Sequence, residues 1–332
     1  LPRDGYIIKT VGRDIYILGK DDQNADPARS MSKGVWIHYH ERGTLFGVYS
    51  FLEQAAGVRF YFPGKMGTVV PKYPYLKLGA FDIVDYPDFT TRKYSIYSGR
   101  WYEGKDRDKK ILPGKNLNVY RLRMETKYIP NCHGLSRLGY LERFGKSHPE
   151  YFALMTSGKR HNNPGMPHPG QLCYNSKVRD EIAKDAEAFL RGKPASSRGA
   201  CRKGRVCWDQ SGFQPGYFNV MPQDAMYPCR CDKCKKYFAG GDQAMSEFIW
   251  GFTADIANRL KKNGVPGKVT MMAYPPYRSI PKTVDIPDNV MVMTAVRGPW
   301  DEHLPEFKQK NDRLRLGRVD LCGLKFVQSR GD

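Results

Sequence analysis

The chain has 332 residues, of which 40% are hydrophobic and 13% aromatic, so it has enough apolar material for a small domain and a larger one, and disorder is excluded over most of its length. Its formal net charge of +20 favours anionic partners such as phosphate backbones, acidic lipids, uronates or sulfated glycans. No apolar run approaches the roughly 20 residues that cross a bilayer, so we expect no membrane span.

The first elements predicted along the chain are strands. Alternating apolar positions predict a hairpin from Gly5–Lys9 and Asp14–Leu18, followed by a polar loop over Lys20–Ser32. A further strand is expected at Val35–Ile37. Together these elements predict a small sheet at the N-terminus.

A helix over residues 44–56 is the clearest element of this N-terminal part. Thr44 is a suitable N-cap, and Gly57 suits the left-handed position that ends a helix. An aromatic strand, Gly-Val-Arg-Phe-Tyr, and a turn at Pro63-Gly64 follow the helix. The apolar stripe expected to pack on the sheet consists of Leu45, Val48, Tyr49, Leu52 and Ala56.

Beyond about residue 85 the pattern changes to alternating strands and helices. Helical periodicity predicts helices over 175–191 and 242–263, with Gly264 as the stop of the second. Strands are expected at Arg92–Tyr97, Leu117–Met124, Tyr151–Leu154, Gln171–Tyr174, Tyr217–Pro222, Lys268–Tyr274, Val290–Thr294 and Val319–Leu324. This alternation predicts parallel strands joined by helical crossovers.

The predicted fold class is therefore α/β with two domains. Residues 1–85 are expected to form a small, sandwich-like α+β domain. Residues 86–332 are expected to form a (β/α)8, TIM-like barrel. Because only six or seven barrel-type strands are counted, we expect the barrel to be incomplete at its C-terminal end.

Three cysteines lie within six residues, at Cys229, Cys231 and Cys234. Three thiolates at this spacing can bind one tetrahedral zinc ion, with a fourth ligand from elsewhere in the chain, and a structural metal is favoured over a catalytic one. A reduced or disulfide-linked loop and a redox-active Cys-x-x-Cys are the alternatives. The candidates for the fourth ligand, which spacing does not separate, are His133, His148, Cys173, Cys201 and Cys207.

Two carboxylates are candidates for acid and base chemistry. Asp224 follows a predicted barrel strand, and barrel enzymes place their chemistry at the carboxyl ends of strands. Glu150 lies in His148-Pro149-Glu150-Tyr151-Phe152 and is the second candidate. The alternatives are structural roles. Asp224 would cap the cysteine loop, and Glu150 would begin the strand expected at Tyr151–Leu154.

Polar and aromatic residues that follow other predicted strands are candidates for substrate binding. An aromatic ring can stack on a sugar, and an arginine can bind a carboxylate with two hydrogen bonds. Structural roles in loop packing are the alternative for each of them. The candidates are His133, Asn175, Tyr274, Arg297 and Trp300.

The stretch from Gly43 to Gly64, with its helix, its Gly-Val-Arg-Phe-Tyr strand and its Pro-Gly turn, resembles the small domain that precedes the barrel in family 20 hexosaminidases and family 67 alpha-glucuronidases. It is most similar to a bacterial group, domain of unknown function 4838. In that group a Cys-x-Cys-x-x-Cys motif also follows a strand that ends in Asp, and His-Pro-Glu-Tyr-Phe also precedes a Gln-Leu-Cys strand. Asp224 would lie near the acid of family 20 enzymes, but the adjacent Asp-Glu pair of that family is missing.

The resemblance implies a carbohydrate-active enzyme, a glycoside hydrolase of the alpha-glucuronidase or hexosaminidase type, that is secreted or periplasmic. Together with the positive charge it predicts an anionic poly- or oligosaccharide as partner. The alternative is a glycan-binding or surface protein that keeps the fold without the chemistry. Nucleic-acid binding is disfavoured because the Lys and Arg residues are dispersed and no recognised reader motif is present.

Overall fold

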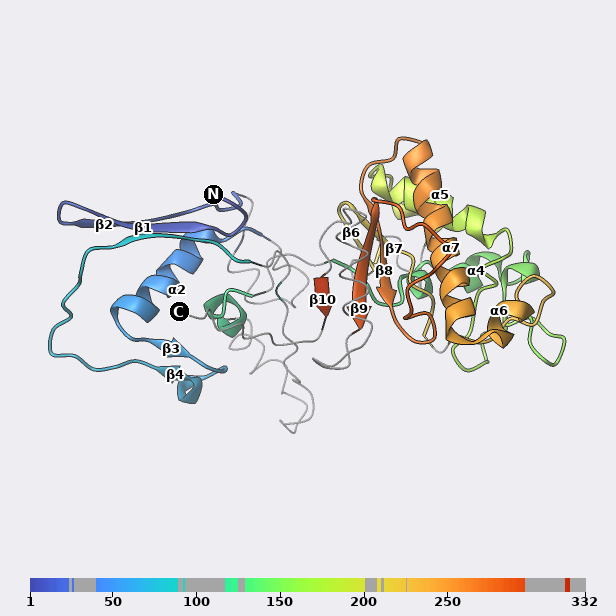
Figure 1. The fold of residues 1–332 in the computed structure, drawn as a ribbon, viewed down its shortest axis with the longest axis horizontal. Coiled ribbons are helices and arrows are strands. Elements are labelled where there is room, and N and C mark those ends of the chain that lie inside the picture. The colour runs from blue at the N-terminus through green and yellow to red at the C-terminus, as the bar shows by residue number, and fades with distance from the viewer. Residues whose placement is uncertain are drawn as a thin grey trace. The chain divides into compact units, whose positions relative to one another are not determined.

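The structure is a computed structural model that describes residues 1–23, 26, 40–88, 92, 117–124, 129–200, 208–209, 212–224, 226–295 and 320–322. The chain divides into two compact units, Leu1–Tyr128 and Ile129–Asp332 (Figure 1). The domain boundary predicted near residue 85 falls inside the first unit, and the division into domains at that point stays a prediction. Each unit is described by itself below.

The first unit contains a three-stranded antiparallel sheet with the order β2-β1-β5. Its strands are β1 (Tyr6–Val11), β2 (Asp14–Gly19) and β5 (Asp82–Asp85). Strands β1 and β2 pair from Tyr6 opposite Gly19 to Val11 opposite Asp14, which confirms the predicted hairpin. Gly12 in its turn has a φ of 61°, a backbone conformation that glycine adopts without strain.

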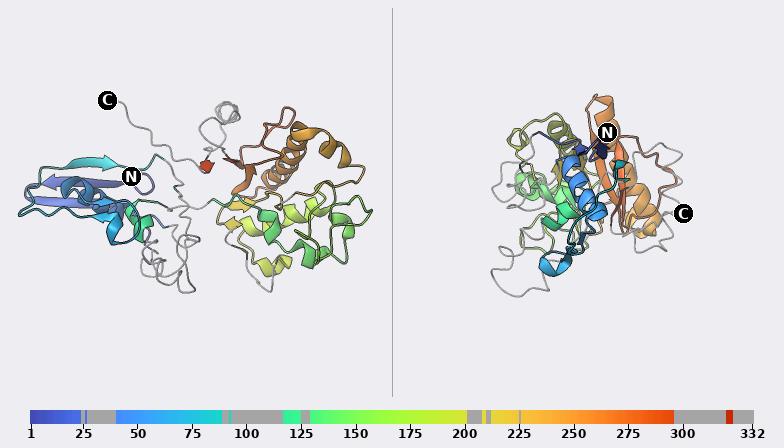
Figure 2. Two further views of the ribbon diagram at one scale, coloured as in Figure 1. Left: turned by 90° about the horizontal axis from the view of Figure 1, so that it is seen from below. Right: turned by 90° about the vertical axis from the view of Figure 1, so that its left-hand side faces the viewer.

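Helix α2 (Gly43–Ala55) packs on β1 and β2, but with a different face from the one expected (Figure 2). Its buried residues are Gly43, Phe46, Gly47 and Ser50, whereas Val48 of the predicted stripe is 36% exposed. A Cβ atom at Gly47 would lie 2.7 Å from Ile17 of the sheet, so the small residues let the helix approach the strands closely. The expected stop is confirmed, because Gly57 has a φ of 64°.

A conservative change in this core has a predictable cost. Ile8 is fully buried between the sheet and α2, and Ile8→Val removes one methylene group, so we expect the free energy of unfolding of the first unit to fall by about 0.5–1.5 kcal/mol. Urea unfolding followed by circular dichroism measures this change. Ile7→Val, on the partly exposed side of the same strand, is the matched control and is expected to cost less. An equal loss in both variants would contradict this packing.

Short elements complete the described part of the first unit. They are β3 (Arg59–Phe60), the 3-10 turn η2 (Lys65–Gly67) and β4 (Thr68–Val69), with β3 and β4 antiparallel. The strand expected at Leu117–Met124 is wrong, because residues 117–121 are helical. The strand at Val35–Ile37 and all of Arg92–Tyr97 except Arg92 lie outside the described residues.

A five-stranded sheet with the order β10-β9-β8-β7-β6 forms the centre of the second unit. Its strands are β6 (Phe213–Gln214), β7 (Tyr217–Asn219), β8 (Lys268–Ala273), β9 (Val290–Ala295) and β10 (Asp320–Cys322). Strands β7 to β10 are parallel, as expected, and β6 pairs antiparallel with β7. The protein is thus a mixed α/β protein, and the strands that the structure describes do not close into a barrel.

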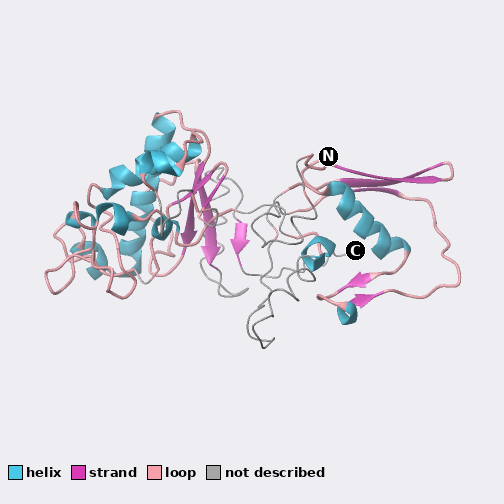
Figure 3. Cartoon of the chain, turned by 180° about the vertical axis from the view of Figure 1, so that it is seen from behind, coloured by secondary structure: helices cyan, strands magenta, loops and turns pink. Residues whose placement is uncertain are grey.

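Two long helices cover this sheet, α5 (Val178–Leu190) and α7 (Gly241–Lys262), and they contact each other as well as the strands (Figure 3). Both confirm the helices predicted from periodicity, and α7 contributes the fully buried Trp250 and Phe252 to the core. The shorter elements are η3 (Gly134–Arg137), α4 (Tyr140–Phe144), η4 (Pro149–Tyr151), η5 (Ala195–Arg198) and α6 (Lys235–Ala239). Within the described residues, no helix is long and apolar enough to cross a membrane.

The strands expected at 151–154 and 171–174 are not formed as full strands, and Tyr151 belongs to η4. The two segments meet at a single antiparallel bridge between Phe152 and Leu172. Backbone hydrogen bonds from Ala153 to Gln171 and from Cys173 to Tyr151 hold the two segments together. Residues of this pair of segments belong to both features of the candidate site, which are a cavity and a cluster of four cysteines.

Candidate functional site

His133 is held beside the carboxyl end of β7. The backbone N–H of Leu135 donates to the carbonyl of Met221 over 3.3 Å, and Nδ1 of His133 lies 3.0 Å from the carbonyl oxygen of Pro222. Because that carbonyl can only accept, Nδ1 carries the proton and Nε2 faces the opposite side of the ring. His133 itself adopts a left-handed backbone conformation with a φ of 44°.

Gly134 allows this close approach of η3 to the strand. A Cβ atom at this position would lie 2.2 Å from the backbone oxygen of Asn219, the last residue of β7. Since no side chain fits into that space, the glycine sets how near His133 comes to the end of the sheet.

The structure brings together three of the predicted site residues. Asp224 follows β7, and its Oδ1 atom lies 3.7 Å from Nε2 of His133. Tyr274 is the first residue after β8, and its ring centroid lies 6.5 Å from that of His133 in an edge-on arrangement. The site therefore lies where two adjacent parallel strands end, which is the usual position of binding sites in α/β sheets.

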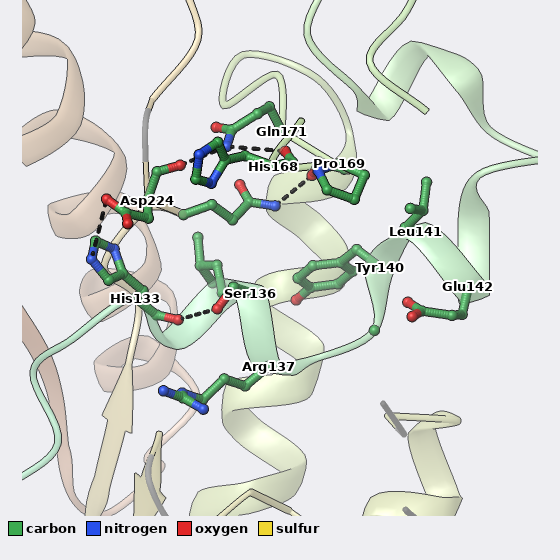
Figure 4. A pocket seen from close by; sticks show the side chains of 14 residues that line it. His133, Ser136, Arg137, Tyr140, Leu141, Glu142, His168, Pro169, Gln171 and Asp224 are labelled. Atoms are coloured by element: carbon green, nitrogen blue, oxygen red, sulfur yellow. Dashed lines mark hydrogen bonds and ion pairs between the residues drawn. The ribbon is translucent and has the colours of Figure 1, made fainter. Parts of the chain in front are cut away.

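A cavity of about 300 Å³ opens beside His133 and Asp224 (Figure 4). Its wall is largely polar, and Figure 4 shows His133 and Asp224 on one side and α4 on the other. The residues that the sequence did not identify as part of the site include Arg137, Tyr140, Glu142, His168, Gln171 and Gln223. Gln171 begins the Gln-Leu-Cys strand of the sequence motif, but that motif gives no sign of a place at this cavity, and the fold brings the segments of all six residues together.

Helix α4, which forms one wall of the cavity, is anchored by a buried carboxylate. Asp185 of α5 is completely buried and accepts hydrogen bonds from Tyr140 at 3.0 Å and from Arg143 at 2.6 and 3.0 Å. Arg198 donates to the same carboxylate over 2.8 Å. Paired in this way, the buried charge ties α4 and η5 to the long helix behind them.

The surroundings of His133 favour its charged form. A hydrogen bond with the Cys132 thiol raises the pKa of His133, and the Pro222 carbonyl and the negative charge of Asp224 act in the same direction, against the effect of burial. The same contact lowers the pKa of Cys132. An imidazolium beside a carboxylate is suited to donating a proton or to binding an anionic group.

A raised pKa makes stability depend on pH. The unfolded imidazole titrates near pH 6.5, so the stabilisation by His133 is fully present below that pH and is lost as the pH rises through the higher folded pKa. We expect the free energy of unfolding of the wild type to fall relative to that of His133→Gln as the pH rises from about 6 to above neutrality. Urea unfolding at a series of pH values measures the difference, and parallel curves for the two proteins would contradict it.

Glu150 lies in a different place from Asp224. Its carboxylate is 55% exposed and lies 3.1 Å from Nδ1 of His148. It lines a separate hollow of about 710 Å³ together with Asn175 and Cys231. The structure therefore brings Glu150 and Asn175 to the cysteine cluster and not into the cavity of Asp224, and their functional roles stay predictions. Arg297 and Trp300 lie outside the described residues.

Four cysteines form a compact cluster in the second unit. Cys173 joins the three cysteines of the motif, and the sulfur atoms of Cys173, Cys229, Cys231 and Cys234 all lie within 4.8 Å of one another. Of the candidate fourth ligands, the structure thus brings Cys173 into the cluster, whereas Cys201 and Cys207 lie outside the described residues. The four thiols are free, and three of them are buried.

The spacing of the four sulfurs suits a metal ion. Sγ of Cys173 lies 3.8 Å from those of Cys231 and Cys234, too far for the bond of about 2.05 Å in a disulfide. With Zn–S bonds of about 2.3 Å, a tetrahedral ion separates its sulfur ligands by about 3.8 Å. Hydrogen bonding with Cys229 raises the pKa of Cys173 to about 12, the direction expected where thiols share one site without a cation. This cluster can hold a metal ion.

Backbone contacts hold the cysteine loop in place. The N–H of Leu154 donates to Sγ of Cys229 over 3.3 Å, and the N–H of Arg230 donates to the carbonyl of Leu154 over 2.8 Å. Hydrogen bonds to a metal-binding sulfur orient it and stabilise its negative charge. The cysteine loop is therefore hydrogen-bonded to Leu154, close to Phe152, which pairs with the neighbour of Cys173.

The fold and the site define a mixed α/β protein with a polar cavity at the carboxyl ends of parallel strands and a four-cysteine cluster beside it. The chain belongs to the family described as domain of unknown function (DUF4838), whose model matches residues 62–200 and 211–307. This confirms the family expected from the sequence motifs. No curated protein is significantly similar to the chain.

Proposed function

We propose that the protein is a carbohydrate-active enzyme of the glycoside hydrolase type, and that its chemistry takes place in the cavity of His133 and Asp224. The observation that carries the proposal is the contact between these two side chains at the carboxyl end of β7, in a polar cavity. A carboxylate in such a cavity is the group that glycoside hydrolysis requires.

The cavity supplies further groups for this chemistry. Glycosidases use two carboxyl groups, or one and a group of the substrate, on either side of the scissile bond. Glu142 of α4 lines the same cavity as Asp224 and is the second carboxylate that we assign. Tyr274 does not line the cavity, but its ring lies next to that of His133, is 41% exposed and offers a face on which a sugar can stack.

The positive charge of the chain supports an acidic glycan as substrate. A net charge of +20 attracts anionic polymers and raises their rate of association. We propose uronate-containing or sulfated oligosaccharides, and we propose that the protein acts outside the cytoplasm, where such polymers are found.

The architecture that we propose around this site is the one that the sequence predicts. It has an N-terminal domain like that of family 67 alpha-glucuronidases and family 20 hexosaminidases, followed by a (β/α)8 barrel. The parallel order β7-β8-β9-β10, with α7 between β7 and β8, supports the barrel.

The experiment is a screen of uronate-containing and sulfated glycans for product release by the purified chain. We expect a subset to be cleaved and the cleavage to depend on Asp224. Binding on a glycan array without any product would instead support the alternative, a non-catalytic glycan-binding protein. Salt-sensitive DNA binding, without glycan cleavage and without glycan binding, would overturn both the enzyme and the glycan-binding alternative.

We also propose that the four cysteines hold one structural zinc ion. A site with four sulfur ligands leaves no position open for water or substrate, which argues for a structural role, and sulfur ligands select zinc among the common divalent ions. Metal analysis of protein purified without chelators is expected to give one zinc per chain. Two disulfides and no metal would overturn the assignment.

A further inference from the structure

Two buried glutamines connect the segment 170–174 to the residues at the end of β7. Gln171 is 2% exposed, and its side-chain Nε2 donates to the backbone oxygen of Asp224 over 2.7 Å. Gln223 is 8% exposed and reaches in the opposite direction. Each glutamine thus binds the segment that carries the other.

The side chain of Gln223 uses both ends of its amide. Its Oε1 accepts hydrogen bonds from the N–H of Leu172 at 3.3 Å and from the hydroxyl of Tyr174 at 3.1 Å. Its Nε2 donates to the carbonyl of Gly170. A buried amide that is bonded at both ends fixes its own backbone, because every alternative position loses hydrogen bonds that water does not replace.

Cys173 ties the same short segment to the cysteine cluster. It lies between Leu172 and Tyr174, whose polar groups hold Gln223, and its sulfur contacts those of Cys231 and Cys234. The segment 170–174 is therefore held on one side by the cysteines and holds the backbone of Asp224 on the other. This arrangement matters because the Asp224 side chain is 67% exposed and is not fixed by burial.

We propose that Gln171 and Gln223 are positioning residues, which hold the carboxylate of Asp224 against His133. The inference rests on the function proposed for this cavity. Neither glutamine has to touch the reacting atoms. Gln171 binds the backbone of Asp224, and Gln223 fixes its own backbone, directly before Asp224. Without them Asp224 keeps its charge but loses its fixed place in the cavity, and misplacement of a reacting group by about 1 Å lowers rates strongly.

The test replaces Gln171 with methionine, which keeps the length of the side chain and removes its donor. Gln243→Met is the matched control, since Gln243 is a partly buried glutamine of α7 that donates to Glu247 and to the Ile280 carbonyl, away from the cavity. NMR titration of the His133 ring reads out the position of the carboxylate without any substrate, and Asp224→Asn defines the full effect of its loss.

We expect Gln171→Met to lower the pKa of His133 by at least half the shift seen in Asp224→Asn, and Gln243→Met to leave it unchanged. With a cleaved glycan in hand, kcat is expected to fall at least tenfold in Gln171→Met while KM changes less than threefold. Gln223→Met, examined in the same way, is the second variant in case the first does not fold.

Two results would overturn the inference. One is a His133 titration in a folded Gln171→Met or Gln223→Met protein that matches the Gln243→Met control. The other is a His133 titration that Asp224→Asn itself does not change, because the pair would then not exist in solution. If no glycan is cleaved, the proposed function fails, but the NMR result still decides whether the glutamines position Asp224.

Discussion

Replacing Cys234 with serine is expected to abolish stoichiometric zinc binding and to lower the free energy of unfolding of the second unit by more than about 4 kcal/mol. Cys234 is fully buried, and its sulfur lies 3.8 Å from that of Cys173. A serine hydroxyl does not replace a thiolate ligand, and the three cysteines that remain would be left crowded and buried around an incomplete site. Zinc content per chain and urea unfolding measure the two effects.

The matched control is Cys132→Ser. Cys132 is exposed and lies outside the four-cysteine cluster, so this variant is expected to keep one zinc per chain and wild-type stability within about 0.5 kcal/mol. Full zinc occupancy in Cys234→Ser would contradict the assignment of the ligands. Equal loss of stability in both variants would show that the thiols matter for packing and not for metal binding.

The cysteine cluster shows which part of a site is readable in a sequence. Cys229, Cys231 and Cys234 are close in the chain, so their spacing alone predicts a shared ligand. Cys173 lies 58 residues before Cys231, and nothing in its local pattern separates it from four other candidates. Long-range contacts bring it to the other three: Leu172 pairs with Phe152, and the nearby Leu154 is hydrogen-bonded to Cys229.

Helix α2 shows a second limit. Its C-terminal end could be predicted, because Gly57 takes the left-handed conformation that ends a helix. The expected N-cap at Thr44 is wrong, because the helix begins at Gly43 and its N-cap is Arg42. Its buried face could not be predicted, because an apolar stripe indicates only which face is most hydrophobic. The face that packs on the sheet is the one that can approach it most closely. Gly43 and Gly47 give that fit, and their lack of a side chain contributes no apolar signal.

The cavity combines both cases. Asp224 and Tyr274 could be predicted because the segments that follow parallel strands share one end of a sheet: Tyr274 directly follows β8, and Asp224 lies in the segment after β7. Glu142 could not, since it lies in a short helix that no periodicity defines, and Gln171 was expected in a strand but not at a site. Residues 117–121, which are helical although a strand was expected, show the same weakness of short apolar runs.

Asp224→Asn is expected to reduce glycan turnover by about 10²–10⁴-fold, the usual contribution of a positioned acid or base, with little effect on stability. The substitution keeps the size of the side chain and removes its charge. Because that side chain is 67% exposed, the free energy of unfolding is expected to change by no more than about 0.5 kcal/mol. Initial rates on a cleaved glycan and urea unfolding of the same preparations measure the two effects.

Asp288→Asn separates a local role of Asp224 from a general effect of charge. Asp288 is similarly exposed, at 62%, and pairs with Lys261 away from the cavity, so its loss changes the net charge by the same amount. If the two variants lost the same turnover, electrostatic attraction of the glycan would explain the effect, and it would weaken as salt screens the surface. A loss confined to Asp224→Asn, and unchanged by salt, places the proton transfer at the carboxylate that faces His133, since screening acts on distant charges and not on a contact of 3.7 Å.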